Sequence, residues 1–100
     1  MGLIETYKKQ ILRLCELYKV KSLYSFGSVN SKLFTENSDV DLMVDFNTDD
    51  PLEYTDNYFQ LKFELEKILK RSIDLLENKA IKNPFLRENI DKSKVLIYGR

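Results

Sequence analysis

Residues 24–46 of the chain read YSFGSVNSKLFTENSDVDLMVDF, and this stretch decides the fold. A short apolar run ends in the pair Gly27-Ser28, and a polar loop then leads to Asp39 and Asp41, which alternate with apolar residues. Alternate residues of a β-strand point to the same face of a sheet. We therefore expect the two carboxylates to project side by side from one strand, next to the turn that ends the strand before it.

Two carboxylates this close repel each other unless one is protonated or a cation lies between them. Ligand sets made only of oxygen suit a hard divalent ion such as Mg²⁺. A Gly-Ser turn beside that ion offers backbone N–H groups and a hydroxyl to phosphate oxygens. The stretch therefore predicts a site for a metal-bound nucleoside triphosphate.

A third acid, Asp74, interrupts the apolar run at residues 73–76. A carboxylate within a central strand is costly unless it is paired or binds a metal. The alternative for Asp74 is an edge-strand residue that faces water. An Asp-x-Asp run and a Gly-Ser pair are each common on their own, but their order, together with Asp74, favours one shared site.

Hydrophobic spacing predicts the secondary structure. The expected elements are a helix at 3–19, a strand at 22–26, a helical turn at 30–34, a strand at 39–46, a long helix at 51–70, a strand at 72–76, a short helix at 84–91 and a strand at 95–98. Asp50 is expected to cap the long helix, with Pro51 at its first position and Glu53 completing a capping box.

This order of elements predicts an α+β fold, in which helices pack mainly on one face of a small mixed sheet. The long helix makes a right-handed crossover if the strands that it joins are parallel neighbours, and the strand at 72–76 then lies beside the strand at 39–46. A chain of 100 residues is expected to form a single domain over residues 1–100.

Composition excludes several classes of function. Sixteen basic and 16 acidic side chains give zero formal charge, so the chain lacks the basic footprint of a nucleic-acid-binding protein. The absence of His excludes Ser-His and Cys-His catalysis and histidine metal sites. Cys15 is alone and falls on an apolar stripe, which predicts a buried thiol and no disulfide within the chain. With neither a signal peptide nor a long apolar span, we expect a cytoplasmic protein without a membrane partner.

The chain resembles the DNA polymerase beta-type nucleotidyltransferase superfamily in three segments, Phe26-Gly27-Ser28, Ser38-Asp39-Val40-Asp41-Leu42 and Ser72-Ile73-Asp74-Leu75. Its small size is similar to that of the minimal nucleotidyltransferases (MNT), which are the antitoxins of HEPN–MNT toxin–antitoxin pairs. The resemblance covers nearly the whole chain. It implies the nucleotidyltransferase fold, with a central mixed sheet.

The resemblance also implies the roles of the site residues. Gly27 and Ser28 would hold the triphosphate of ATP, the nucleotide donor. Asp39, Asp41 and Asp74 would be the catalytic acids and would hold two Mg²⁺ ions.

One departure from the family concerns the residues after the Gly-Ser pair. Family members often carry Ala-Arg-Gly there, whereas this chain has Asn30-Ser31-Lys32. Lys32 is expected to replace the Arg only in part, as a point charge without the planar fork of a guanidinium group.

The expected reaction is Mg²⁺-dependent transfer of AMP from ATP to a hydroxyl group, which the resemblance implies to be a tyrosine of a helical HEPN toxin. Two metal ions would clamp the attacking and leaving oxygens, and Asp74 would serve the attacking side and accept the proton. One alternative is a catalytically weak antitoxin that silences its toxin by binding it. Another is transfer to a small molecule, with a homo-oligomer or a second domain completing the pocket.

Overall fold

The computed structural model describes residues 2–30, 34–35 and 37–99. Four strands form one sheet in the order β3-β2-β1-β4. Their bounds are β1 (Val20–Phe26), β2 (Val40–Phe46), β3 (Ile73–Glu77) and β4 (Val95–Gly99). β2 and β3 run parallel, whereas β1 pairs antiparallel with both β2 and β4. The mixed sheet and the placement of β3 beside β2 confirm the predicted topology.

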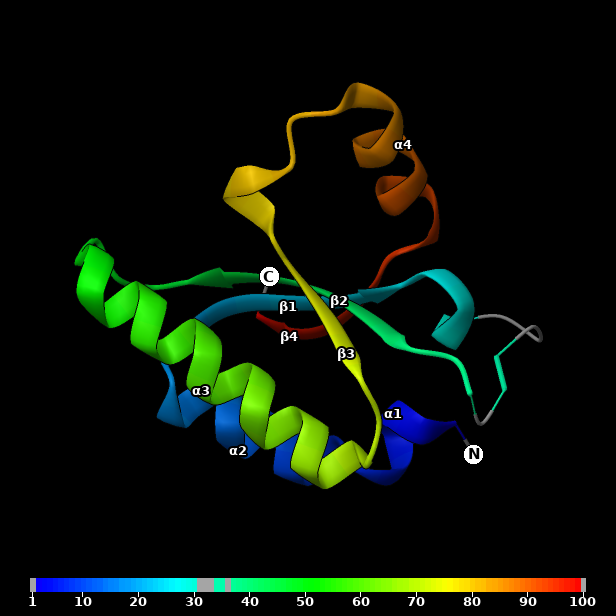
Figure 1. Cartoon of the computed structure of the whole chain (residues 1–100), viewed down its shortest axis with the longest axis horizontal. Coiled ribbons are helices and arrows are strands. Elements are labelled where there is room, and N and C mark those ends of the chain that lie inside the picture. Colours follow the sequence, from blue (N-terminus) through cyan, green and yellow to red (C-terminus); the bar gives the residue numbers. More distant parts are fainter. Residues whose placement is uncertain (1, 31–33, 36, 100) are drawn as a thin grey trace.

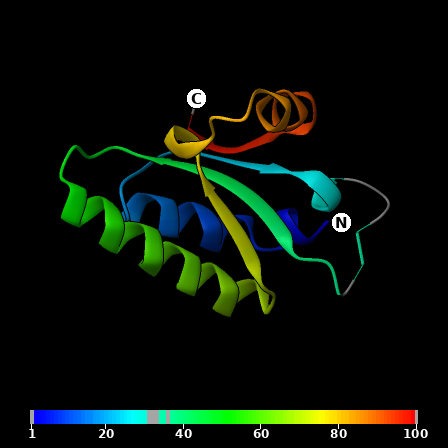
Figure 2. The same cartoon turned by 45° about the horizontal axis from the view of Figure 1, so that its top comes forward.

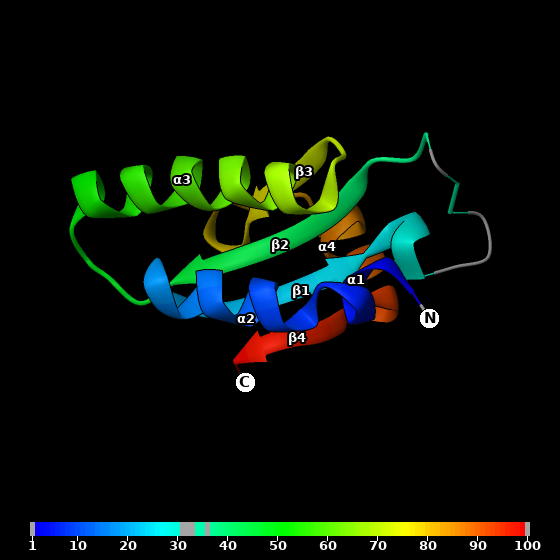
Figure 3. The ribbon, with the colours of Figure 1, turned by 90° about the horizontal axis from the view of Figure 1, so that it is seen from below.

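The helices lie on both faces of this sheet, but mainly on one (Figure 1). The first face is covered by α1 (Leu3–Thr6), α2 (Lys8–Leu17) and α3 (Pro51–Leu69). Figure 3 looks onto this face and shows α2 and α3 in front of the strands. The opposite face carries α4 (Pro84–Ser93), as Figure 2 shows. Within the part of the chain that the structure describes, no helix has the length and apolar character needed to cross a membrane.

The main hydrophobic core lies between the sheet and the first three helices. Its members come from β2, whose Val40, Leu42, Val44 and Phe46 are almost fully buried, and from leucines of α3. Cys15 also belongs to this core and is completely buried, as predicted. Burial, followed by the charge of Glu16, raises the pKa of its thiol to about 12. Cys15 is therefore an inert packing residue.

A smaller cluster lies on the opposite face, where Phe26 and Met43 pack against Ile90 of α4. Arg87 ties α4 to a short 3₁₀ helix at Asn78–Ala80, because its guanidinium donates at 2.8 Å to both the side-chain and main-chain oxygens of Asn78. This face is only partly covered, and the acids of β2 and β3 belong to it.

Two local predictions need correction. The predicted helix at 3–19 is divided at Tyr7, whose ψ of 17° separates α1 from α2. Hydrophobic spacing misses this break because Ile4 and Ile11, on either side of it, both face the core. β1 is followed by a 3₁₀ helix at Gly27–Asn30, and the predicted helical turn at 30–34 stays a prediction. Of that predicted turn, residues 31–33 lie outside the described residues.

The predicted capping box of α3 is half right. The Asp50 carboxylate accepts a hydrogen bond from the Leu52 N–H at 3.0 Å, as predicted. The Asp50 N–H, however, donates to the Thr48 hydroxyl at 3.3 Å. Glu53 instead pairs with the Lys19 ammonium at 3.1 Å, so a cation distant in the sequence replaces the predicted second half of the box.

Candidate nucleotide-transfer site

The centre of the candidate site is a pair of carboxylates on adjoining strands. In the parallel register of β2 and β3, Asp41 stands opposite Asp74, and paired residues of neighbouring strands project from the same face. Burial raises the pKa of the Asp41 carboxyl, and the negative charges of Asp74 and Asp39 raise it further. The three predicted acids therefore lie close enough to act on one another electrostatically.

Asp39 and Asp41 leave the sheet on the face away from α2 and α3. Val40 between them is fully buried in the core on the helix-covered side, so the flanking residues point the other way. Asp39 is exposed and stands just before the first residue of β2, whereas Asp41 is half-buried. The structure thus places Asp39 and Asp41 on the face where Asp74 lies.

Gly27 meets Asp41 from the other neighbouring strand. Phe26, the last residue of β1, pairs with Asp41, and Gly27 follows it with a φ of 72°. A Cβ added at Gly27 would lie 2.5 Å from Oδ2 of Asp41. Both the left-handed backbone and this close approach require glycine. The Gly-Ser turn and the acid pair therefore meet at one place, as the sequence predicted.

Ser28 and Lys32 are the other two predicted phosphate-binding residues. Ser28 follows Gly27 in the 3₁₀ helix at Gly27–Asn30, which places its backbone beside the acids. Lys32 lies outside the described residues, and its predicted role remains a prediction.

The three acids offer a Mg²⁺ ion only oxygen donors. Among the residues that the structure describes, no three His, Cys, Asp or Glu side chains are grouped tightly enough to hold a metal ion by themselves. Mg²⁺ is ordinarily held by one or two carboxylates together with phosphate oxygens of a substrate, and not by a cage made of protein alone. The Asp41–Asp74 pair with Asp39 beside it fits that mode, because its oxygens and its mutual repulsion favour a bound cation.

Arg71 is a site-supporting residue that sequence reasoning missed. It lies in the turn between α3 and β3, and its guanidinium donates to the carbonyl oxygens of Thr35 at 2.8 Å and Ser38 at 3.2 Å. The same group stacks over the Phe34 ring, 4.5 Å from its centroid. No local pattern could have revealed these contacts, since the two hydrogen bonds join positions 33 and 36 residues apart.

The contacts of Arg71 bear directly on Asp39. Ser38 precedes Asp39, and the Val40 N–H that follows it donates to the Ser72 carbonyl at 3.1 Å. The turn before β3 therefore holds the backbone on both sides of Asp39. Arg71 is a positioning residue for this acid.

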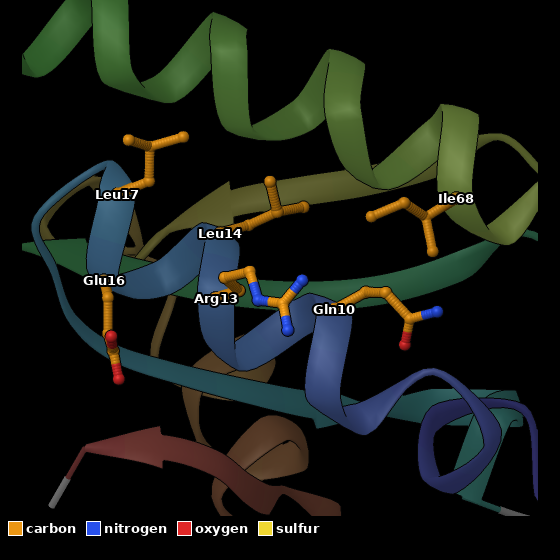
Figure 4. A pocket seen from close by; sticks show the side chains of 6 residues that line it. All are labelled: Gln10, Arg13, Leu14, Glu16, Leu17 and Ile68. Carbon is orange, nitrogen blue, oxygen red and sulfur yellow. The ribbon is translucent and has the colours of Figure 1, made fainter.

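A hollow in the surface lies away from these acids. It has a volume of about 630 Å³ and lies between α2 and α3, on the helix-covered side of the sheet (Figure 4). Leu14, Leu17 and Ile68 provide its apolar lining, and Arg13 and Glu16 stand at its rim. None of the predicted site residues lines it.

Two curated relatives resemble this chain over most of their length. A 94-residue alignment shows 37% identity to "Putative protein adenylyltransferase MJ1379" of Methanocaldococcus jannaschii, covering 89% of this chain and 93% of the relative. A second protein of that organism, "Putative protein adenylyltransferase MJ0128", is 38% identical over 90 residues, covering 89% of this chain and 86% of the relative.

Two solved structures show the same fold. A structure described as a "putative minimal nucleotidyltransferase" matches with a TM-score of 0.76 and 28% identity, over 95% of both chains. A structure of a tri-AMPylated Shewanella oneidensis HEPN toxin in complex with an MNT antitoxin matches with a TM-score of 0.66 and 19% identity, over 96% of this chain and 72% of the other. At that identity, the second match supports the fold alone.

The match to the family itself covers nearly the whole chain. The profile of the nucleotidyltransferase domain family aligns with residues 7–97, a range that includes the Gly-Ser turn and all three acids. The resemblance found in the sequence is thereby confirmed, and the chain belongs to the nucleotidyltransferase domain family.

Proposed function

We propose that this nucleotidyltransferase moves AMP from ATP to a hydroxyl group of a protein, in a reaction that depends on Mg²⁺. The observation that carries the proposal is the meeting of Asp41 with Asp74 on one side and with Gly27 on the other. Acids held this close to an open glycine turn can accept a cation whose other ligands are the phosphates of a nucleotide.

In the proposed reaction, an acceptor oxygen attacks the α-phosphorus of ATP. The bond from that phosphorus to the bridging oxygen breaks, and pyrophosphate leaves with the bonding electrons. When bound, two Mg²⁺ ions would neutralise the charge that develops on the attacking and leaving oxygens. Gly27 lets the backbone approach the triphosphate closely, and we assign Ser28 and Lys32 to the same phosphates.

The three acids divide the remaining work. Asp41, which meets Gly27, and Asp39, two residues before it, would hold the cation on the nucleotide side. Asp74, which comes from the other strand and is exposed, faces the attacking hydroxyl and takes its proton, directly or through a water molecule. The raised pKa of Asp41 belongs to the protein without a cation, and a bound cation would oppose it.

We further propose that the acceptor is a tyrosine of a HEPN toxin. The relatives in Methanocaldococcus jannaschii carry names that describe protein adenylyltransferases. Similar folds occur in structures described as a tri-AMPylated HEPN toxin with an MNT antitoxin and as a toxin–antitoxin pair with AMP-PNP. Modification of such a toxin would make this chain its antitoxin.

Co-expression with the neighbouring gene product tests this proposal. The intact mass of the co-purified partner should rise by one or more AMP units, and tandem mass spectrometry should place them on tyrosine. Co-expression with Asp41→Asn should leave the partner unmodified. A partner that binds tightly and is silenced without any added mass would contradict the transferase and support an antitoxin that acts by binding alone.

A further inference from the structure

The outer side of α3 carries large apolar side chains that the fold does not bury. Its inner side supplies Leu61, Leu65 and Leu69 to the core, each at most 3% exposed. On its outer side, the exposed fractions are 78% for Leu52, 61% for Phe59 and 59% for Phe63. Residues seven and eleven positions after Leu52 share one side of an α-helix, so these three form a single stripe.

This outer stripe (Leu52, Phe59 and Phe63) is not part of the nucleotide-transfer site. α3 covers the face of the sheet opposite to the one from which Asp41 and Asp74 project, as Figure 3 shows for the helix. The two phenylalanines are ordered by their neighbours. The Phe59 ring meets Tyr58 edge to face at 5.1 Å, and the Lys67 ammonium lies over the Phe63 ring at 5.5 Å. A grouped, exposed apolar stripe of this kind marks an interaction surface.

Charge varies along the same side of α3. Asp56 is exposed in the N-terminal half, and Lys67 and Lys70 are exposed toward the C-terminal end. The other acids of the C-terminal half are occupied, because Glu66 accepts the Ile73 N–H at 3.1 Å and Glu64 lies 3.6 Å from Lys67. Asp56 thus places negative charge beside the stripe between Leu52 and Phe59. Lys67 and Lys70 place positive charge beyond Phe63, and Glu64 offsets part of the charge of Lys67.

We propose that this stripe binds a second copy of the chain, through an antiparallel pairing of α3 with α3. A twofold axis near Leu61 sets Phe59 against Phe63 of the second copy. It also brings Asp56 beside Lys67 of the second copy, and each contact occurs twice, as in any isologous interface. Apolar side chains meet at the centre and opposite charges meet at the ends, so the surface complements itself.

Sedimentation velocity of the full chain over a concentration series tests the pairing. The parent chain should pass from monomer to dimer as its concentration rises. Phe63→Glu should weaken dimerisation at least tenfold, since it places a charge at the centre of the interface. Phe85→Glu is the matched control, because Phe85 is 76% exposed on α4, and it should leave the dimer unchanged. A parent chain that stays monomeric at about 0.1 mM would overturn the proposal.

A charge exchange separates a second copy from any other occupant of the stripe. Asp56→Lys sets lysine against lysine across the twofold axis and should weaken the dimer. The double variant Asp56→Lys/Lys67→Asp should restore it, because each exchanged residue then meets its complement in the identical partner. Both variants must keep the parental circular dichroism spectrum. A folded double variant that dimerises as weakly as Asp56→Lys would contradict the antiparallel pairing. Dimerisation of Phe63→Glu as strong as that of the parent would contradict it as well.

Discussion

At the scale of single residues, Asp41 connects the parts of the candidate site. It has Gly27 as its neighbour on the β1 side and Asp74 as its partner on β3. Removing its charge should therefore affect both the nucleotide and the remaining acids, whereas removing the charge of Asp74 should affect mainly the reaction.

The two acids should differ in a measurable way. Asp41→Asn should weaken ATP binding and abolish AMP transfer, because its charge balances the cation that holds the triphosphate. Asp74→Asn should keep ATP affinity within a few-fold while transfer falls about 100-fold or more, since its interaction is made mainly in the transition state. Titration calorimetry with Mg²⁺ and ATP, together with rates of AMP transfer, measures both. Asp49→Asn, an exposed acid before α3, is the control. An Asp74→Asn protein that transfers AMP at the rate of the parent would show that β3 is not part of the site.

Asp41 should also influence stability in the absence of metal. Its pKa is raised in the folded state by burial and by Asp74 and Asp39, so ionisation of Asp41 opposes folding. This cost is absent below the unfolded value of 3.8 and grows as the pH rises through the folded pKa. Asp41→Asn should raise the melting temperature at pH 7 by a few degrees at most, since the carboxyl is only partly buried, and the gain should vanish near pH 3. Calorimetry in EDTA would contradict this if Asp41→Asn were less stable than the parent at pH 7.

Arg71 should act on the reaction through Asp39. Arg71→Ala should lower the turnover rate about 10- to 100-fold, because it frees the backbone before this acid. Arg71→Lys keeps a charge but not the double contact with Thr35 and Ser38, so it should recover activity only partly. A lysine that restored full activity would show that charge alone matters. An unchanged turnover rate in Arg71→Ala, measured on protein shown to be folded, would rule out the positioning role.

At the scale of elements, α3 shows which local signals were reliable. Asp50 and Pro51 predicted its start, because a cap and a first-turn proline depend on neighbours in the sequence. Glu53 pairs with Lys19 instead, because the folded chain places this cation where it competes with the Asp50 N–H for the Glu53 carboxylate. Tertiary contacts also change the pattern of β2. Its alternation predicted one apolar face, yet Met43 is buried on the other face as well, because α4 and Phe26 cover it.

The cap of α3 has a predictable energetic effect. Asp50→Ala should lower the free energy of unfolding by about 1 kcal/mol, because the Leu52 N–H loses its acceptor. For a chain of this size, that loss corresponds to a decrease of roughly 4–8 °C in melting temperature. Asp49→Ala alters the neighbouring exposed acid and should change stability little. Equal effects of the two substitutions in chemical denaturation would show that the contribution of Asp50 is general charge and not capping.

At the scale of the whole molecule, the sequence predicted the strand pairing of the sheet better than the loops and helices packed around it. The parallel pairing of β2 with β3 followed from the long helix between them, and with it came the meeting of Asp41 and Asp74. The clamp of Arg71 on the segment before Asp39 could not be predicted, because it joins residues that only the folded chain brings together. The position of α4 on the acid-bearing face likewise depends on tertiary contacts such as those of Arg87.

We propose that the acids of β2 and β3 transfer AMP from ATP to a protein partner. The most direct measurement incubates the purified chain and its helical partner with Mg²⁺ and ATP radiolabelled at either the α- or the γ-phosphorus. Label from the α-position should enter the partner, label from the γ-position should not, and Asp41→Asn and EDTA should each prevent the transfer. Transfer of the γ-label, or equal α-labelling by the parent and Asp41→Asn, would contradict the proposal.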